Sequence, residues 1–192
     1  EKYITDVACY WIKECDIDGW RLDVGDEISH FFWKNFRKAV KAVKKDMLII
    51  GEIWHYAGDF LEGDEWDTVM NYPFYLNLID LLADEKINVS QFIQNLGYLK
   101  GRLNKKCYPL MWNLIDSHDT ARFLHLCKNN KKKQHLAAAF QLLLPGMPMI
   151  YYGDEFAMPG ANDPDCRRGM YWDEEYQDKE MFEWYKQLLK VR

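Results

Sequence analysis

Five short apolar runs, each followed by a helical pattern, constrain the fold of this chain more than any other feature. The runs cover residues 17–24, 47–52, 68–71, 111–115 and 147–152. Apolar side chains at helical spacing fill 1–14, 29–43, 75–99, 132–144 and 179–191, and the third of these segments holds two helical patterns. Strands alternating with helices, with one helix in front, are typical of an α/β fold with a parallel sheet. We expect the helical crossovers to be right-handed.

Acidic side chains follow four of the five predicted strands. They are Asp23, Glu52, Asp119 and the pair Asp154–Glu155. In a (β/α)8 barrel the carboxyl ends of the strands converge on one face, which holds the active site. In an open doubly wound sheet the same ends line a crevice. In either fold, carboxylates that are far apart in the sequence come together.

The first of these strands has one apolar face and one charged face. Trp20, Leu22 and Val24 alternate with Arg21 and Asp23. A charged strand face must be paired and hydrogen-bonded if it is buried, and the neighbouring cation keeps Asp23 ionised. An ionised carboxylate at a strand end can be a nucleophile or a metal ligand. The alternative is a structural ion pair.

The strand-end acids suggest a reaction class. Crowded carboxylates shift their pKa values apart, so that one stays protonated while another is ionised. Glycoside hydrolysis needs such a pair. A separation of about 5–5.5 Å gives a covalent intermediate and retention, and a wider gap gives inversion. The sequence leaves this distance open.

Composition excludes several other classes of protein. The 192 residues suffice for one domain, and the net charge is −5. The basic run Lys131–Lys133 is short and is expected to begin a helix, so we expect no nucleic-acid partner. No run reaches the roughly 18 apolar residues of a membrane span. The many aromatic residues, 8 Trp, 12 Tyr and 10 Phe, suit a sugar-binding surface or, more commonly, a packed core.

The cysteines indicate a reducing compartment. There are five, at positions 9, 15, 107, 127 and 166, with no C-x-x-C pair. An odd number without such spacing favours free thiols and a cytoplasmic location. The chain begins at Glu1 without an initiator methionine and within a helical pattern, so we expect it to be part of a longer protein.

Other catalytic motifs receive little support. Ser117-His118-Asp119 contains the residue types of a serine triad, but neighbouring residues rarely adopt triad geometry. There is no G-x-S-x-G, no H-E-x-x-H and no glycine-rich phosphate loop. We therefore predict no metal site and no nucleotide cofactor.

Four motifs occur in order: DGWRLDV at 18–24, GEIWH at 51–55, SHDT at 117–120 and PMIYYGDE at 148–155. With them the chain resembles glycoside hydrolase family 13, the α-amylase family of carbohydrate metabolism. It is most similar to the cyclomaltodextrinase, neopullulanase and maltogenic amylase branch. The resemblance covers essentially the whole chain and implies a partial TIM (β/α)8 barrel, with strands four to eight and their helices.

The resemblance also implies roles for the site residues. Asp23 would be the nucleophile, with Arg21 as its partner, and Glu52 the general acid and base. Asp119 would be the third acid and His118 a sugar-binding residue beside it. The other substrate-binding candidates are Glu27, which matches the branch pattern, and two aromatic residues that either stack on sugars or pack in the core, Trp54 and Tyr72. Asp154 and Glu155 are expected to be structural.

The chain departs from the family pattern in two ways. The Asp-x-x-x-Asn-His motif, strands one to three, the inserted domain and the C-terminal β-domain are missing, so we interpret residues 1–192 as the C-terminal portion of the catalytic barrel. The branch reads Val-Ala-Asn-Glu after the nucleophile, whereas residues 24–27 read Val-Gly-Asp-Glu, so Asp26 departs. The loop 162–168 also resembles that branch, either as part of the sugar subsites or as a plain surface loop.

The resulting hypothesis is a retaining α-glucan hydrolase. Its substrates would be maltooligosaccharides, cyclodextrins or pullulan, cleaved at α-1,4 and conceivably α-1,6 linkages. The alternatives are an α-glucan transglycosylase and a catalytically silent carbohydrate-binding paralogue. We expect the isolated chain to be inactive and no cofactor to be needed. Calcium would bind through segments outside this chain, and association into a homo-oligomer is left open.

Overall fold

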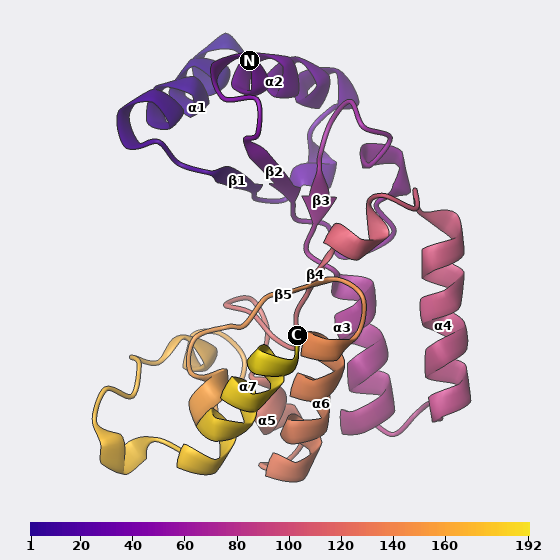
Figure 1. The fold of residues 1–192 in the computed structure, drawn as a ribbon, viewed down its shortest axis with the longest axis vertical. Helices are drawn as coiled ribbons and strands as arrows, with labels where there is room; N and C mark the ends of the chain where they lie inside the picture. Colours follow the sequence, from indigo (N-terminus) through magenta and orange to yellow (C-terminus); the bar gives the residue numbers. More distant parts are fainter. The chain divides into compact units, whose positions relative to one another are not determined.

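The computed structural model describes residues 1–192, which form two compact units (Figure 1). Unit 1 comprises Glu1–Met70 and Lys100–Met111. Unit 2 comprises Asn71–Leu99 and Trp112–Arg192. Each unit is described by itself.

Unit 1 is built on a three-stranded parallel sheet of order β1-β2-β3. Its elements are α1 (Lys2–Cys15), β1 (Gly19–Leu22), α2 (His30–Val43), β2 (Leu48–Gly51) and β3 (Thr68–Val69). The register pairs Leu22 with Gly51 and Gly51 with Val69. The ends of β1 and β2 therefore lie side by side, and the residues that follow them leave the sheet together.

Local signals explain α2 and its orientation. Ser29 caps the helix, its hydroxyl accepting a hydrogen bond from Phe32 N at 3.3 Å. The buried face of α2 carries Phe32, Trp33, Phe36 and Val40 at helical spacing. α1 and α2 pack against each other (Figure 1).

An aromatic cluster lies beneath the ends of β1 and β2. Trp66 is 1% exposed and stacks on Phe60, with ring centroids 4.1 Å apart. It also meets Trp33 edge to face at 5.9 Å. The Trp33 indole donates to the Gly25 carbonyl at 2.8 Å. These aromatic residues pack in the core and do not form a sugar-binding surface.

Unit 2 contains a two-stranded parallel sheet, β4-β5, and most of the remaining helices. Its elements are α3 (Tyr72–Leu78), α4 (Val89–Arg102, whose last turn falls in unit 1), β4 (Trp112–Asn113), α5 (Phe123–Leu126), α6 (Lys131–Leu143), β5 (Met147–Pro148) and α7 (Lys179–Val191). α6 packs against α7, and α5 against α6. The core of this unit includes buried side chains from α3, α4, α5, α6 and α7.

The structure confirms the five strands, their parallel pairing within each sheet and the main helices. Lys131 begins α6, as expected for the basic run. All five cysteines are free.

The prediction for Val24 was wrong. β1 ends at Leu22, and Val24 adopts a left-handed backbone with φ of 45° and an exposed side chain. The alternation stops there because the 3-10 turn Gly25–Glu27 begins immediately afterwards.

Candidate active site

Two carboxylates in unit 1 share one guanidinium. Arg21 Nη1 binds Asp23 Oδ1, and Arg21 Nη2 lies 2.8 Å from Glu52 Oε1. The register that aligns Leu22 with Gly51 brings Asp23 and Glu52 to neighbouring strand ends. Arginine suits this position because its planar fork can hold two carboxylates with fixed geometry.

The two carboxyls differ in environment. The Asp23 side chain is 74% exposed, whereas that of Glu52 is 6% exposed. Glu52 Oε2 accepts a hydrogen bond from Val24 N at 3.0 Å, and Trp54 Nε1 donates to Oε1 at 3.4 Å. The exposed Asp23 carboxyl can contact a substrate directly, and the buried Glu52 carboxyl is held in place by these hydrogen bonds.

The backbone of Glu52 is also fixed. Its N–H donates to the Leu22 carbonyl at 2.9 Å, and its own carbonyl accepts from Gly25 N at 3.1 Å. The preceding Gly51 lies against the Trp66 ring, since a Cβ there would fall 2.2 Å from Trp66 Cε3. Glycine at 51 therefore permits the close approach that positions Glu52.

The loops after β1 and β2 are joined by a second pair. Asp26 Oδ2 lies 3.0 Å from His55 Nε2. Asp26 is the residue that departs from the branch pattern, and the sequence offered no sign of its partner. Glu27 follows with an exposed side chain, and Trp54 exposes 42% of its surface.

In unit 2, His118 and Asp119 form a pair. His118 Nε2 lies 3.0 Å from Asp119 Oδ2. Asp119 N donates to Ser117 Oγ at 3.2 Å, and Ser117 N donates to Thr120 Oγ1 at 2.9 Å. These hydrogen bonds form a tight turn that presents both side chains.

The loop 160–168 supports this turn. Arg167 Nε donates to the His118 carbonyl at 2.9 Å, and Arg167 Nη2 lies 3.4 Å from Asp119 Oδ1. Cys166 Sγ also donates to the His118 carbonyl, at 3.3 Å. The loop that resembles the branch thus contacts Asp119 directly. Sequence reasoning had singled out the loop but not Arg167.

Ser117 is not placed as a nucleophile. It is fully buried, and its Oγ lies 3.3 Å from the Tyr72 hydroxyl. This geometry argues against a serine triad. Tyr72 is itself 0% exposed and meets the Tyr75 ring edge to face, so the structure favours packing over sugar stacking for Tyr72.

Asp154 and Glu155 have structural contacts. Asp154 is 1% exposed beside Arg122, and Glu155 Oε2 accepts from Gly153 N at 2.8 Å. This agrees with the role expected for them.

The predicted site residues therefore form two groups. The structure brings Arg21, Asp23 and Glu52 together in unit 1, and His118 and Asp119 together in unit 2.

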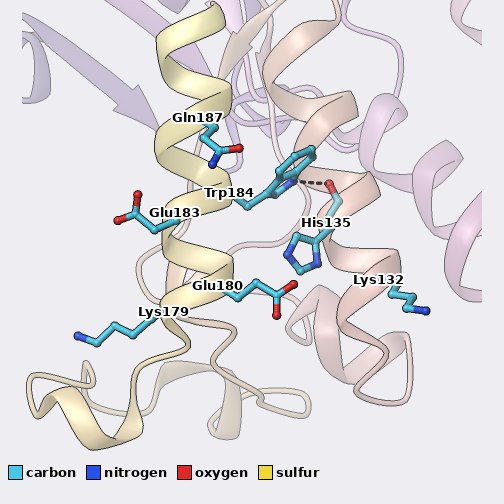
Figure 2. A pocket seen from close by; sticks show the side chains of 7 residues that line it. All are labelled: Lys132, His135, Lys179, Glu180, Glu183, Trp184 and Gln187. Carbon is cyan, nitrogen blue, oxygen red and sulfur yellow. Dashed lines mark hydrogen bonds between the residues drawn. The ribbon is translucent and has the colours of Figure 1, made fainter.

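Unit 2 also has a pocket on its surface. It is formed between α6 and α7, where Trp184 Nε1 donates to the His135 carbonyl at 2.9 Å (Figure 2). Lys132, Glu180 and Glu183 also line it. None of the lining residues is a predicted site residue.

No three His, Cys, Asp or Glu side chains are arranged to hold a metal ion. No helix combines the length and the apolar character that a membrane crossing requires.

Comparisons with known proteins agree with the fold and the motifs. The family model of the α-amylase catalytic domain matches residues 1–192. The cyclomaltodextrinase of Thermoanaerobacter pseudethanolicus is 50% identical over the whole chain, which covers 33% of that protein. The intracellular maltogenic amylase of Bacillus subtilis is 45% identical over the whole chain, again covering 33%. The chain thus spans about a third of the length of these curated relatives.

A solved structure shows the same similarity. The cyclic α-maltosyl-(1→6)-maltose hydrolase of Arthrobacter globiformis, in complex with that sugar, superimposes with a TM-score of 0.96 at 36% identity. The match covers 99% of this chain and 43% of the other. The fold is therefore of the α/β, TIM-barrel type. The chain belongs to the α-amylase family, as the motifs had predicted.

Proposed function

We propose that this chain is part of a retaining α-glucan hydrolase. It would supply strands four to eight of a (β/α)8 barrel, and the remaining strands and domains would come from a longer protein. The observation that carries the proposal is the Arg21 guanidinium, which binds carboxyls at the ends of two adjacent strands. Two carboxyls joined through one planar group are consistent with the short separation of about 5–5.5 Å that retention needs.

The first chemical step uses both carboxyls. The ionised, exposed Asp23 attacks the anomeric carbon of the sugar while Glu52 gives its proton to the leaving glycosidic oxygen. The glycosidic bond breaks, and an ester forms between Asp23 and the sugar. Arg21 orients Asp23 for this attack.

The second step restores the enzyme. Glu52, now ionised, takes a proton from water, whose oxygen attacks the anomeric carbon and displaces Asp23. Two inversions at the same carbon leave its configuration unchanged. A sugar hydroxyl in place of the water would give transfer of the sugar. The ratio of hydrolysis to transfer therefore depends on which of the two reaches the anomeric carbon.

In unit 2, His118 and Asp119 would bind sugar hydroxyls. Their pairing at 3.0 Å and the support from Arg167 favour a fixed donor and acceptor for sugar hydroxyls. Trp54, which is partly exposed beside Glu52, is a stacking surface for a sugar ring. Glu27, in the turn that follows β1, would also bind the sugar.

The substrate class follows from the relatives. Cyclomaltodextrinase and maltogenic amylase relatives support α-glucan oligosaccharides or polysaccharides as substrates. The carboxyl chemistry requires no cofactor. The free cysteines and the relative named as intracellular support a cytoplasmic location.

The test compares two aspartates that flank β1, Asp18 and Asp23, in the full-length enzyme. Asp23→Asn should lower kcat on a cyclomaltodextrin at least about 10³-fold, because the nucleophile is lost. Asp18 precedes β1 at the opposite end, with a side chain that is 98% exposed and paired with Lys44. Asp18→Asn should leave kcat unchanged, since chemistry in such barrels lies at the carboxyl ends of the strands.

Product configuration provides an independent readout. NMR of the first product should show the α anomer. A β product, or full activity in Asp23→Asn, would contradict the proposal.

A further inference from the structure

Three charged residues are buried together in unit 2. Asp116, Arg122 and Asp154 are each 1% exposed and come from segments after β4, before α5 and after β5. Arg122 Nη1 lies 3.3 Å from Asp154 Oδ1. A buried charge is tolerated only when it is paired. Two ionised carboxylates beside one guanidinium would leave one negative charge unbalanced.

The neighbouring groups supply no second positive charge. Tyr75 faces Asp116 from α3, Tyr185 faces both carboxyls from α7, and Glu155 adds a further acid. Gln134 on α6 donates to the Asp154 carbonyl at 3.1 Å. Burial raises the pKa of Tyr75 to about 12 and that of Tyr185 well above its ordinary value, so both phenols stay neutral.

A single proton restores the balance. Burial, followed by the charge of Asp116, raises the pKa of Asp154 well above its ordinary range. Burial raises the pKa of Asp116 as well, but its hydrogen bonds to Asp154 and to Phe123 N and the charge of Arg122 oppose the shift. One oxygen of each carboxyl, Asp116 Oδ1 and Asp154 Oδ2, has no other hydrogen-bond partner.

The cluster is tied to the turn that carries His118 and Asp119. Asp116 Oδ2 accepts a hydrogen bond from Phe123 N at 2.7 Å. This bond joins the two ends of the segment 117–122, which contains His118 and Asp119. Arg122 N donates to the Gly160 carbonyl at 2.9 Å, and its Nε donates to the Cys166 carbonyl at 3.1 Å. Cys166 in turn donates to the His118 carbonyl.

Arg122 has little freedom to adjust. Its Cζ lies 4.0 Å from the centre of the Tyr151 ring and 4.7 Å from that of Tyr152, and Nη1 donates to the Tyr152 carbonyl. A change in the charge around Arg122 would therefore act on the loop 160–168 and on the turn.

We propose that Asp116 and Asp154 share one proton at neutral pH and that the neutral cluster they form with Arg122 positions the turn bearing His118 and Asp119. The positioning role rests on the proposed function, whereas the shared proton does not. Asp116, Arg122 and Asp154 are positioning residues, since they act on the sugar only through the turn.

Infrared spectroscopy tests the proton without reference to activity. The full-length Glu52→Gln protein, which lacks the proton of the proposed general acid, should show the C=O band of a protonated carboxyl at neutral pH. Adding Asp154→Asn to this protein should remove the band, whereas adding Asp173→Asn, at an exposed position of the same unit, should leave it. A Glu52→Gln protein without the band, or a Glu52→Gln/Asp154→Asn protein that keeps it, would overturn the shared proton.

The pH dependence of kcat tests the positioning. Because the amide of Asn mimics a protonated carboxyl, Asp154→Asn should keep kcat within about twofold at neutral pH. Loss of the proton at alkaline pH places two negative charges beside Arg122, so the wild type should show an additional fall in kcat that the variant lacks. Superimposable profiles would overturn the positioning role.

A second variant, Asp154→Ala, removes the side-chain polar group altogether and is compared with Asp154→Asn. Asp154→Ala can neither donate nor accept, and should lower kcat at least about tenfold with little change in KM. Activity equal to that of Asp154→Asn would also argue against positioning. If Asp154→Ala does not fold, the wild-type and Asp154→Asn profiles decide the question.

Discussion

At the scale of single residues, Arg21 links the two carboxyls on which the proposed chemistry depends. The sequence predicted its pairing with Asp23, because two residues two apart on a strand share a face. It did not predict the pairing with Glu52, since that contact depends on the register between β1 and β2. The sequence also did not predict the environment of Tyr72, because the burial of its ring depends on tertiary packing.

Gly51 gives a prediction at this scale. A methyl group at 51 would fall 2.2 Å from the Trp66 ring, which is itself fully buried. Gly51→Ala should cost about 1–3 kcal/mol of stability through overpacking. It should also lower kcat, because Glu52 is the next residue.

The matched control is Gly97→Ala in α4, where a Cβ meets nothing within 4 Å. Alanine there should be neutral or stabilising, by up to about 1 kcal/mol. Thermal unfolding of both variants in the full-length protein checks the comparison. Equal melting temperatures would contradict the packing argument.

At the scale of elements, local chemistry made the helices predictable. Ser29 caps α2, and Asn88 and Gln91 exchange hydrogen bonds at the start of α4. Strand lengths were less predictable. The runs at 111–115 and 147–152 form only two-residue strands, since pairing there depends on neighbours distant in sequence.

At the scale of the whole molecule, the division into two units does not follow from composition. No linker separates them in the sequence, and unit 1 includes a segment from beyond unit 2's first helices. Motif order nevertheless predicted the family. The acids at the strand ends belong to both units, a division that no local sequence pattern indicates.

This organisation predicts the behaviour of residues 1–192 alone. The strands form sheets of three and two, whereas a closed barrel of this type has eight. β1 and β3 are edge strands of their sheet, which favours association. The 192-residue chain should therefore show less than about 1% of the full-length kcat/KM on a maltooligosaccharide and should associate on size-exclusion chromatography. Activity within tenfold of the full-length enzyme would contradict this prediction.

The most direct test of the central claim is to trap the sugar on Asp23. In the full-length Glu52→Gln variant, an α-glucosyl substrate with a good leaving group needs no acid for the first step, but the second step lacks its base. The glycosyl-enzyme should accumulate, and mass spectrometry of a protease digest should locate the sugar on the peptide that contains Asp23. A sugar attached to another residue, or the absence of any adduct together with release of the β anomer, would contradict the account.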